Sequence, residues 1–219
     1  MLCGDTCENS TCLCQACIED LPYINTACAS CGLPLEHHNG ESSICGQCQS
    51  EPTPIQHCIS IFHYDSPVDY LIKHMKYHNQ LSVADLMGKM IAKKVKSIGQ
   101  NLPDLIIPVP LHVERLKQRG YNQAIEIGRL VSRDLNIPLD HTACTRVKHT
   151  LPQFDIPAAE RSDNIKNAFE VSRQLDAKHV ALIDDVMTTG STAREIATVL
   201  TQNGVTQVDV WTCARATIA

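Results

Sequence analysis

The spacing of hydrophobic and polar positions changes near residue 59. Beyond that point, short apolar runs are separated by stretches in which apolar residues recur every three or four positions. The runs predict strands and the periodic stretches predict helices. The expected strands are 59–64, 104–110, 178–183 and 205–212, and the expected helices are 68–77, 81–98, 122–135 and 192–200. Strands that alternate with helices favour the α/β class, in which helices flank a parallel sheet.

A parallel sheet also predicts where a ligand binds. Ligands of such sheets lie beyond the carboxyl ends of the strands, in the loops that lead to the next helix. Two loops of this kind follow the runs 104–110 and 178–183. The stretch 146–169 has little apolar periodicity, so it predicts a long loop of the type that often covers an active site.

The residues before 59 hold ten of the 12 cysteines, and six of these form three C-x-x-C pairs. Two such pairs supply the four soft ligands that a tetrahedral zinc ion needs. The pairs at 28/31 and 45/48 are separated by a spacing typical of zinc ribbons. We therefore expect a small zinc-ribbon-like domain at 1–58, ahead of the α/β domain at 59–219, with zinc ligands Cys28, Cys31, Cys45 and Cys48.

The third pair, Cys14 and Cys17, needs two partners for a second zinc ion. Cys3 and Cys7 have three residues between them, which fits the spacing of zinc ligands, and Cys12 is an alternative to either. A redox role for Cys14 and Cys17 is the rival hypothesis. A redox pair usually opens a helix beside a strand, and the pattern predicts no such unit here.

The charges divide the chain in a similar way. Residues 1–72 contain nine acidic residues and no lysine or arginine, whereas the net charge of the whole chain is only −5. The remainder is therefore slightly basic. An acidic cysteine-rich domain is a poor candidate for gripping nucleic acid and a better one for protein contacts or for packing on the rest of the chain.

Apolar stretches long enough to span a membrane are not evident in the sequence, and the amino terminus lacks the pattern of a signal peptide. We therefore expect a cytoplasmic protein. In that reducing compartment, numerous cysteines point to metal binding rather than to disulfides.

The strongest chemical signal is the stretch 180–192, which reads VALIDDVMTTGST. Asp184 and Asp185 follow an apolar run and, when ionised, accept hydrogen bonds from hydroxyl groups such as those of a sugar. The loop after them can bind a phosphate monoester through hydroxyls, close backbone approach and the amides of a helix start. Its residues are Thr188, Thr189, Gly190, Ser191 and Thr192. Neither a Walker loop nor a G-x-G-x-x-G motif is present.

The loop after 104–110 carries positive charge. Arg115 and Arg119 suit bidentate contacts with phosphate oxygens, and Gly120 allows a tight turn before the next helix. The alternative interpretation is a solvated basic turn. Lys148 adds positive charge from the long loop 146–169.

Stretch 180–192 resembles the ribose-phosphate loop of type I phosphoribosyltransferases, which bind phosphoribosyl pyrophosphate (PRPP). Together with the cysteine pairs and the block PVPL…R…RGYNQA, it resembles the ComF/ComFC/GntX family. A further block of this resemblance comprises Arg146, Thr150, Gln153, Glu160, Arg161, Asn164, Ala168 and Phe169. The sequence departs from the family at its start, where the first C-x-x-C is not intact.

The resemblance implies a type I phosphoribosyltransferase-like domain behind a structural zinc finger. It implies that PRPP, or another phosphorylated ligand, binds with Mg²⁺ at 188–192, that Asp184 and Asp185 are the catalytic pair, and that Arg115, Arg119 and Lys148 help to bind it. It also implies a role in natural transformation, in the handling or uptake of single-stranded DNA in the cytosol with other competence proteins as partners. The alternatives are an active phosphoribosyltransferase of unknown acceptor and a non-catalytic sensor of PRPP.

The basic residues that could contact DNA follow from the charge pattern of the α/β part. Affinity for DNA rests largely on phosphate contacts by such residues. The candidates are Lys73, Lys76, Lys89, Lys93, Lys94, Arg115 and Arg119.

Overall fold

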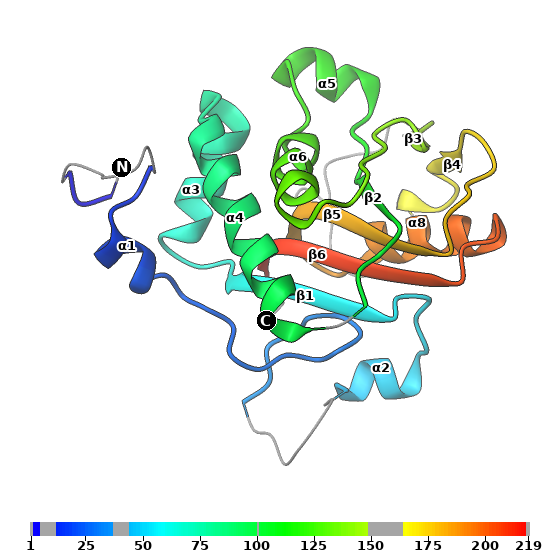
Figure 1. Cartoon of the computed structure of the whole chain (residues 1–219), viewed down its shortest axis with the longest axis horizontal. Coiled ribbons are helices and arrows are strands. Elements are labelled where there is room, and N and C mark those ends of the chain that lie inside the picture. The colour runs from blue at the N-terminus through cyan, green and yellow to red at the C-terminus, as the bar shows by residue number, and fades with distance from the viewer. Residues whose placement is uncertain (1, 5–11, 37–43, 100, 149–163, 218–219) are drawn as a thin grey trace.

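A computed structural model describes residues 2–4, 12–36, 44–99, 101–148 and 164–217 (Figure 1). Its centre is a four-stranded sheet in the order β1-β6-β5-β2, and all neighbouring strands are parallel. The strands are β1 (His57–His63), β2 (Leu105–Pro108), β5 (His179–Met187) and β6 (Gln207–Arg215). The larger helices are α3 (Val68–His78), α4 (Leu81–Ile98), α6 (Gln123–Leu135) and α8 (Ser191–Gln202). The predicted α/β class is confirmed.

Both faces of the sheet are buried in core clusters. Side chains on a strand alternate between the two faces, so each strand contributes to both clusters. On β5, Ala181 and Ile183 pack in one core cluster with residues of α3, α4 and α6. Val180 and Leu182 of the same strand pack in a second cluster with residues of α8. This explains the near-continuous apolar run of β5, which a strand with one solvated face would not have.

Two helix ends position the loops that follow the strands. Asn122 precedes α6, where its Oδ1 accepts a hydrogen bond from the amide of Ala124 at 2.9 Å. Its Nδ2 donates to the carbonyl of Val109 at 3.0 Å, which fixes the chain just after β2. Gly190 precedes α8 with φ +77°, a conformation that side chains other than glycine rarely adopt. Both loops therefore reach the same end of the sheet in fixed positions.

Several elements differ from the sequence prediction. The loop expected after 104–110 contains a short helix, α5 (Val113–Arg119). The stretch 146–169, expected as a loop, overlaps a small antiparallel pair formed by β3 (Cys144–Arg146) and β4 (Phe169–Val171), whereas its residues 149–163 lie outside the described residues. Strand β5 runs through Asp184 and Asp185 to Met187, four residues beyond its predicted end.

The cysteine-rich residues pack directly on the sheet. The ring of Tyr23 lies 4.8 Å from the ring of Phe62 in β1, and the amide of Ile24 donates to the carbonyl of Ile61 at 2.9 Å. The amide of His63 donates to the carbonyl of Pro22 at 2.8 Å. Strand β1 begins at His57, so the expected domain boundary at residue 58 falls inside it. None of the described helices is long and apolar enough to cross a membrane.

Two short helices begin at C-x-x-C pairs, where the sequence pattern predicted none. Cys14 precedes α1 (Gln15–Glu19), and Cys45 precedes α2 (Gly46–Ser50). The second cysteine of each pair therefore lies within the first helical turn. This arrangement directs both sulfurs of a pair to the same end of its helix, as a shared metal ion requires.

Candidate functional site

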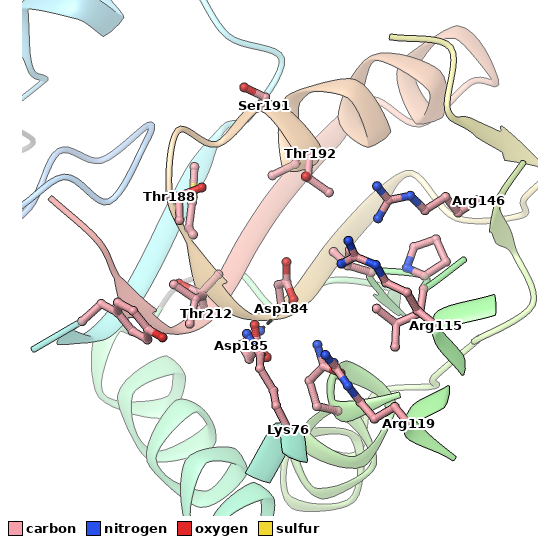
Figure 2. A pocket seen from close by; sticks show the side chains of 18 of the residues that line it. Lys76, Arg115, Arg119, Arg146, Asp184, Asp185, Thr188, Ser191, Thr192 and Thr212 are labelled. Carbon is pink, nitrogen blue, oxygen red and sulfur yellow. Dashed lines mark hydrogen bonds and ion pairs between the residues drawn. The ribbon is translucent and has the colours of Figure 1, made fainter. Parts of the chain in front are cut away.

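A cavity of about 820 Å³ lies at the carboxyl end of the sheet. Such a volume is typical of a site for a small molecule. Figure 2 shows Asp184 and Asp185 at its centre, the 188–192 loop on one side, and arginine side chains on the other. The predicted residues that line it are Arg115, Arg119, Asp184, Asp185, Thr188, Thr189, Gly190, Ser191 and Thr192.

The two acidic residues lie in strand β5 itself, so the backbone holds them firmly. Asp185 is only 3% exposed, and its Oδ2 lies 2.9 Å from Nζ of Lys76 on α3. The contact has the distance of an ion pair but not the alignment of a hydrogen bond, and Oδ2 accepts no hydrogen bond from the described residues. Burial lowers the pKa of Lys76, but the charge of Asp185 outweighs burial and raises it above the usual value.

Asp184 has a different environment from its neighbour. Burial raises the pKa of Asp184 to about 7, and the charge of Asp185 adds to this effect. The charges of Lys76 and Arg146 oppose the rise, as does the amide of Asp185, which donates to Oδ1 of Asp184 at 2.8 Å. Asp184 is the more exposed of the two, so it is the acid that a ligand in the cavity meets.

The 188–192 loop is held by contacts on its inner side. Nη2 of Arg194 donates to the carbonyl of Thr189 at 3.1 Å, and the hydroxyls of Thr189 and Ser191 lie 2.8 Å apart. A Cβ atom at Gly190 would lie 2.5 Å from Cε of Met187, so a larger residue there would have to displace that side chain as well as adopt a positive φ. Figure 2 shows Thr188, Ser191 and Thr192 around the opening above Asp184.

Three arginines form the opposite wall of the cavity. Arg115 and Arg119 project from α5, and Arg146 projects from the end of β3 (Figure 2). Nη1 of Arg119 donates to Oε1 of Gln123 at 2.5 Å, and its guanidinium lies 5.6 Å from the ring centre of Tyr77. Burial lowers the pKa of Arg146 to about 10, and the charge of Arg115 acts in the same direction. The site therefore gathers positive charge that an anionic ligand would stabilise.

Lys148 is not brought to this cavity. It is exposed, and its Nζ donates to the carbonyl of Lys166 at 2.9 Å. The arginine two residues earlier, Arg146, lines the cavity instead. Strand β3 ends at Arg146, so Lys148 lies beyond it, and the apolar pattern predicts no strand here from which this difference could be inferred.

Lys76 is the most important residue that sequence reasoning placed elsewhere, as a possible DNA contact. Its ion pair with Asp185 leaves it inside the cavity wall rather than on the basic surface. A signal was present, because Lys76 follows Ile72 by four positions on the apolar stripe of α3. A lysine on a buried helix face usually has an acidic partner.

The four cysteines predicted as a zinc site come together. Sγ atoms of Cys28, Cys31, Cys45 and Cys48 all lie within 4.8 Å of one another, and those of Cys31 and Cys45 are 3.7 Å apart. Sulfurs that surround zinc tetrahedrally at about 2.3 Å lie about 3.8 Å from one another. The amide of Cys45 also donates to Sγ of Cys28 at 3.3 Å. These residues fit a structural zinc ion.

The second predicted cluster is described in part. Sγ atoms of Cys3, Cys14 and Cys17 lie within 4.8 Å of one another, whereas Cys7 lies outside the described residues. Cys12 is described but does not belong to this group. The 11 cysteines in the described parts of the chain form no disulfide.

Metal analysis of the purified protein tests the first cluster. We expect replacement of Cys28 and Cys31 by serine to remove one zinc ion per chain, because two ligands cannot hold the ion against solvent. Replacement of Cys144 by alanine is the control, since this buried cysteine belongs to neither group. An unchanged zinc content in the serine variant would show that the ion binds elsewhere.

Known proteins similar to this chain are consistent with these features. No family model matches the chain. The DNA utilization protein YhgH of Escherichia coli strain K12 is 34% identical over 207 residues, covering 93% of this chain and 90% of the relative. Competence protein F of Haemophilus influenzae is 36% identical over 210 residues, covering 93% of this chain and 89% of the relative.

Among solved structures, a purine phosphoribosyltransferase from Pyrococcus horikoshii Ot3 aligns with 60% of this chain and 82% of its own length, with a TM-score of 0.39 and 19% sequence identity. The sequence relatives cover far more of the chain and at higher identity. Because these relatives are more than 30% identical over about nine tenths of both chains, the chain belongs to the ComF family.

Proposed function

We propose that this protein binds PRPP, or a closely related phosphoribosyl ligand, in the cavity at the carboxyl end of the sheet. The observation that carries the proposal is the arrangement of the cavity wall. The phosphate loop 188–192 lies on one side, Asp184 and Asp185 lie at the centre, and Arg115 and Arg119 lie opposite. This order matches the 5-phosphate, the ribose hydroxyls and the pyrophosphate of PRPP.

Each part of the ligand meets a group of suitable chemistry. Hydroxyls and helix-start amides at 188–192 suit a phosphate monoester. The carboxylate of Asp184 accepts hydrogen bonds from ribose hydroxyls, while Asp185 forms an ion pair with Lys76. Mg²⁺ prefers oxygen ligands and keeps several waters, so Asp184 and the pyrophosphate oxygens would hold it, and its charge would neutralise the phosphates.

The biological role that we propose is in DNA utilization or competence, where single-stranded DNA is handled in the cytosol. Two relatives that match nearly the whole chain carry names of that kind. The α/β part of the chain has exposed lysines on α4 that could contact a phosphate backbone, namely Lys89, Lys93 and Lys96. Binding that rests on these residues would weaken steeply with added salt.

A binding measurement with a conservative variant tests the phosphoribosyl site. We expect Asp184→Asn to weaken PRPP binding about tenfold, because hydrogen bonds to a charged acceptor are worth more than those to a neutral amide. Calorimetric titration of PRPP with Mg²⁺ measures the change. Asp184 is preferred to Asp185 for this test, since replacing Asp185 would leave Lys76 without its partner.

The control for that titration is Asp85→Asn, an exposed acid on α4. The control should bind PRPP as tightly as the parent protein. If the parent binds no PRPP, or if Asp184→Asn binds as well as the parent, the proposal is wrong. A transformation assay with Asp184→Asn then tests whether the same site serves DNA uptake.

Catalysis is a second candidate function that the three arginines favour. Arg115, Arg119 and Arg146 gather at the end of the cavity where pyrophosphate would leave. In a transfer reaction, the bond from the anomeric carbon to the pyrophosphate oxygen breaks, and a bond to an acceptor nucleophile forms. The arginines would stabilise the charge that develops on the leaving group. Release of pyrophosphate in the presence of nucleobases, ammonia or DNA ends tests this function.

A further inference from the structure

Arg215, at the end of β6, joins the cysteine cluster to the phosphate loop. Its Nε donates to the carbonyl of Cys31 at 2.9 Å. Its Nη1 donates to the carbonyl of Met187 at 3.3 Å and also to that of Thr188. One guanidinium therefore binds the backbone of a metal ligand and the backbone at the start of the phosphate loop.

A second series of contacts runs beside this arginine. The amide of Cys58 donates to the carbonyl of Ala29, inside the 28–31 turn, at 2.6 Å. Sγ of Cys58 lies 3.6 Å from Sδ of Met187. Gly32 packs so closely on Cys58 that a Cβ atom there would lie 2.8 Å from its Sγ. The 28–31 turn thus fits against the residues that support the loop.

The electrostatic setting of Arg215 also points to the cluster. Arg215 is only 5% exposed, and in the described parts of the chain it forms no ion pair with a carboxylate. Its acceptors are backbone carbonyls, which leave a buried positive charge without a full counter-charge. Four thiolates around Zn²⁺ carry a formal charge of about −2. The occupied cluster would supply the missing negative charge.

We propose that zinc bound by Cys28, Cys31, Cys45 and Cys48 holds the phosphate loop in its binding conformation through Arg215. The affinity for a phosphorylated ligand therefore depends on occupancy of the zinc site. This inference rests on the proposed function, since it concerns the same loop. Arg215 is a positioning residue in this scheme, because it acts on the ligand through the backbone of Met187 and Thr188.

The physical reason is that a loop held in place binds its ligand without first losing conformational freedom. Zinc fixes the 28–31 turn, the turn fixes the guanidinium, and the guanidinium fixes two carbonyls at the loop. By linkage, a ligand in the loop must strengthen zinc binding by the same factor by which zinc strengthens ligand binding.

The proposal is tested by titrating ribose 5-phosphate into the protein in two states. One state has zinc bound, and the other has been treated with a zinc-selective chelator. We expect zinc removal to weaken binding about tenfold, a coupling of ordinary size for linked sites. The matched control is the double variant Cys14→Ser with Cys17→Ser, which disrupts only the other cysteine group. It should bind ribose 5-phosphate as the parent does.

Variants of Arg215 test whether the coupling between zinc and the phosphate loop runs through its guanidinium. Arg215→Met should bind weakly whether or not zinc is present, while Arg215→Lys, which keeps the charge, should regain part of the affinity and part of the zinc dependence. Arg129→Met, an exposed arginine that pairs with Glu126, is the control and should behave as the parent. In the parent, ribose 5-phosphate should also tighten the retention of zinc against the chelator.

Hydrogen exchange keeps the proposal testable even where a variant folds poorly or no ligand binds. In the parent protein without ligand, zinc removal should increase amide exchange in the peptide that spans 187–192 as well as at the cysteines. If exchange at the loop does not change, the proposal is overturned. If exchange changes but ribose 5-phosphate never binds, the coupling stands and the proposed function fails.

Discussion

Replacement of Lys76 by methionine is expected to lower the free energy of unfolding by about 3–5 kcal/mol at pH 8, the cost of leaving a buried charge without its partner. Methionine keeps much of the side-chain volume but removes the charge that faces Asp185. Asp184 and Asp185 in β5 then remain inside the protein without the positive charge that faces them from α3. Urea denaturation followed by circular dichroism measures the change.

This cost should shrink as the pH falls. The pKa of Asp184 is raised from 3.8 to about 7, so the folded protein holds more protons than the unfolded chain between those pH values. Asp184 therefore destabilises the fold increasingly as the pH rises through that window. Removing Lys76 raises the pKa of Asp184 further and moves the window upward. At pH 5 Asp184 binds a proton, and the loss of unfolding free energy should be clearly smaller than at pH 8.

Lys73→Met is the control for this experiment. Lys73 lies three residues before Lys76 on α3 and pairs with Asp69 at 2.7 Å. Both side chains of this pair are partly or largely exposed. A surface ion pair contributes little, so we expect little change in stability. If Lys76→Met lowers the free energy of unfolding equally at pH 5 and pH 8, the loss comes from packing rather than from charge.

Gly190→Ala is expected to weaken binding of ribose 5-phosphate by at least about 100-fold, the loss of two charge-assisted hydrogen bonds. The added methyl group would meet Cε of Met187, and φ of +77° disfavours alanine in any case. Both effects move the loop away from the conformation that presents its hydroxyls and amides to a phosphate. Calorimetric titration measures the affinity.

Gly204→Ala is a matched control for Gly190→Ala. Gly204 also has a positive φ, of +90°, but a Cβ atom there meets nothing within 4 Å, and Gly204 does not line the cavity. This variant should lose a similar amount of backbone stability and keep its ligand affinity. If both glycine variants bind ribose 5-phosphate alike, the phosphate does not sit in the 188–192 loop.

The sequence predicted the α/β class and the larger helices because their signals are local and strong. The apolar stripe of α4 recurs over 18 residues, and its end at Ile98 agrees with the structure. The apolar run of β5 was equally clear, but its true end was not. Asp184 and Asp185 look like the end of a strand, yet parallel pairing with β6 continues to Met187. Hydrogen bonds between strands override the polarity of two residues.

Other parts of the site depended on contacts between distant segments, which spacing alone does not reveal. The loop residues 188–192 and the arginines of α5 could be inferred, because each follows a strand at the same end of a parallel sheet. The position of Lys76 on α3 indicates a buried lysine with an acidic partner, but not which partner, because Asp185 lies more than 100 positions later in the sequence. The role of Arg215 is not evident from the sequence for the same reason, since its guanidinium contacts Cys31 and Thr188, which are far from it along the chain.

The order of strands in the sheet has a consequence for how the chain folds during its synthesis. Strand β1, which ends at His63, pairs with β6, which begins only at Gln207. Ribosomes add roughly 5–20 residues per second, so on the order of 10 s passes between the two strands. During that time β1 and the cysteine turn beside it lack the neighbour on which they later pack. We therefore expect the sheet to assemble only after β6 has been synthesised, and loss of β6 to separate β1 from β5 and β2.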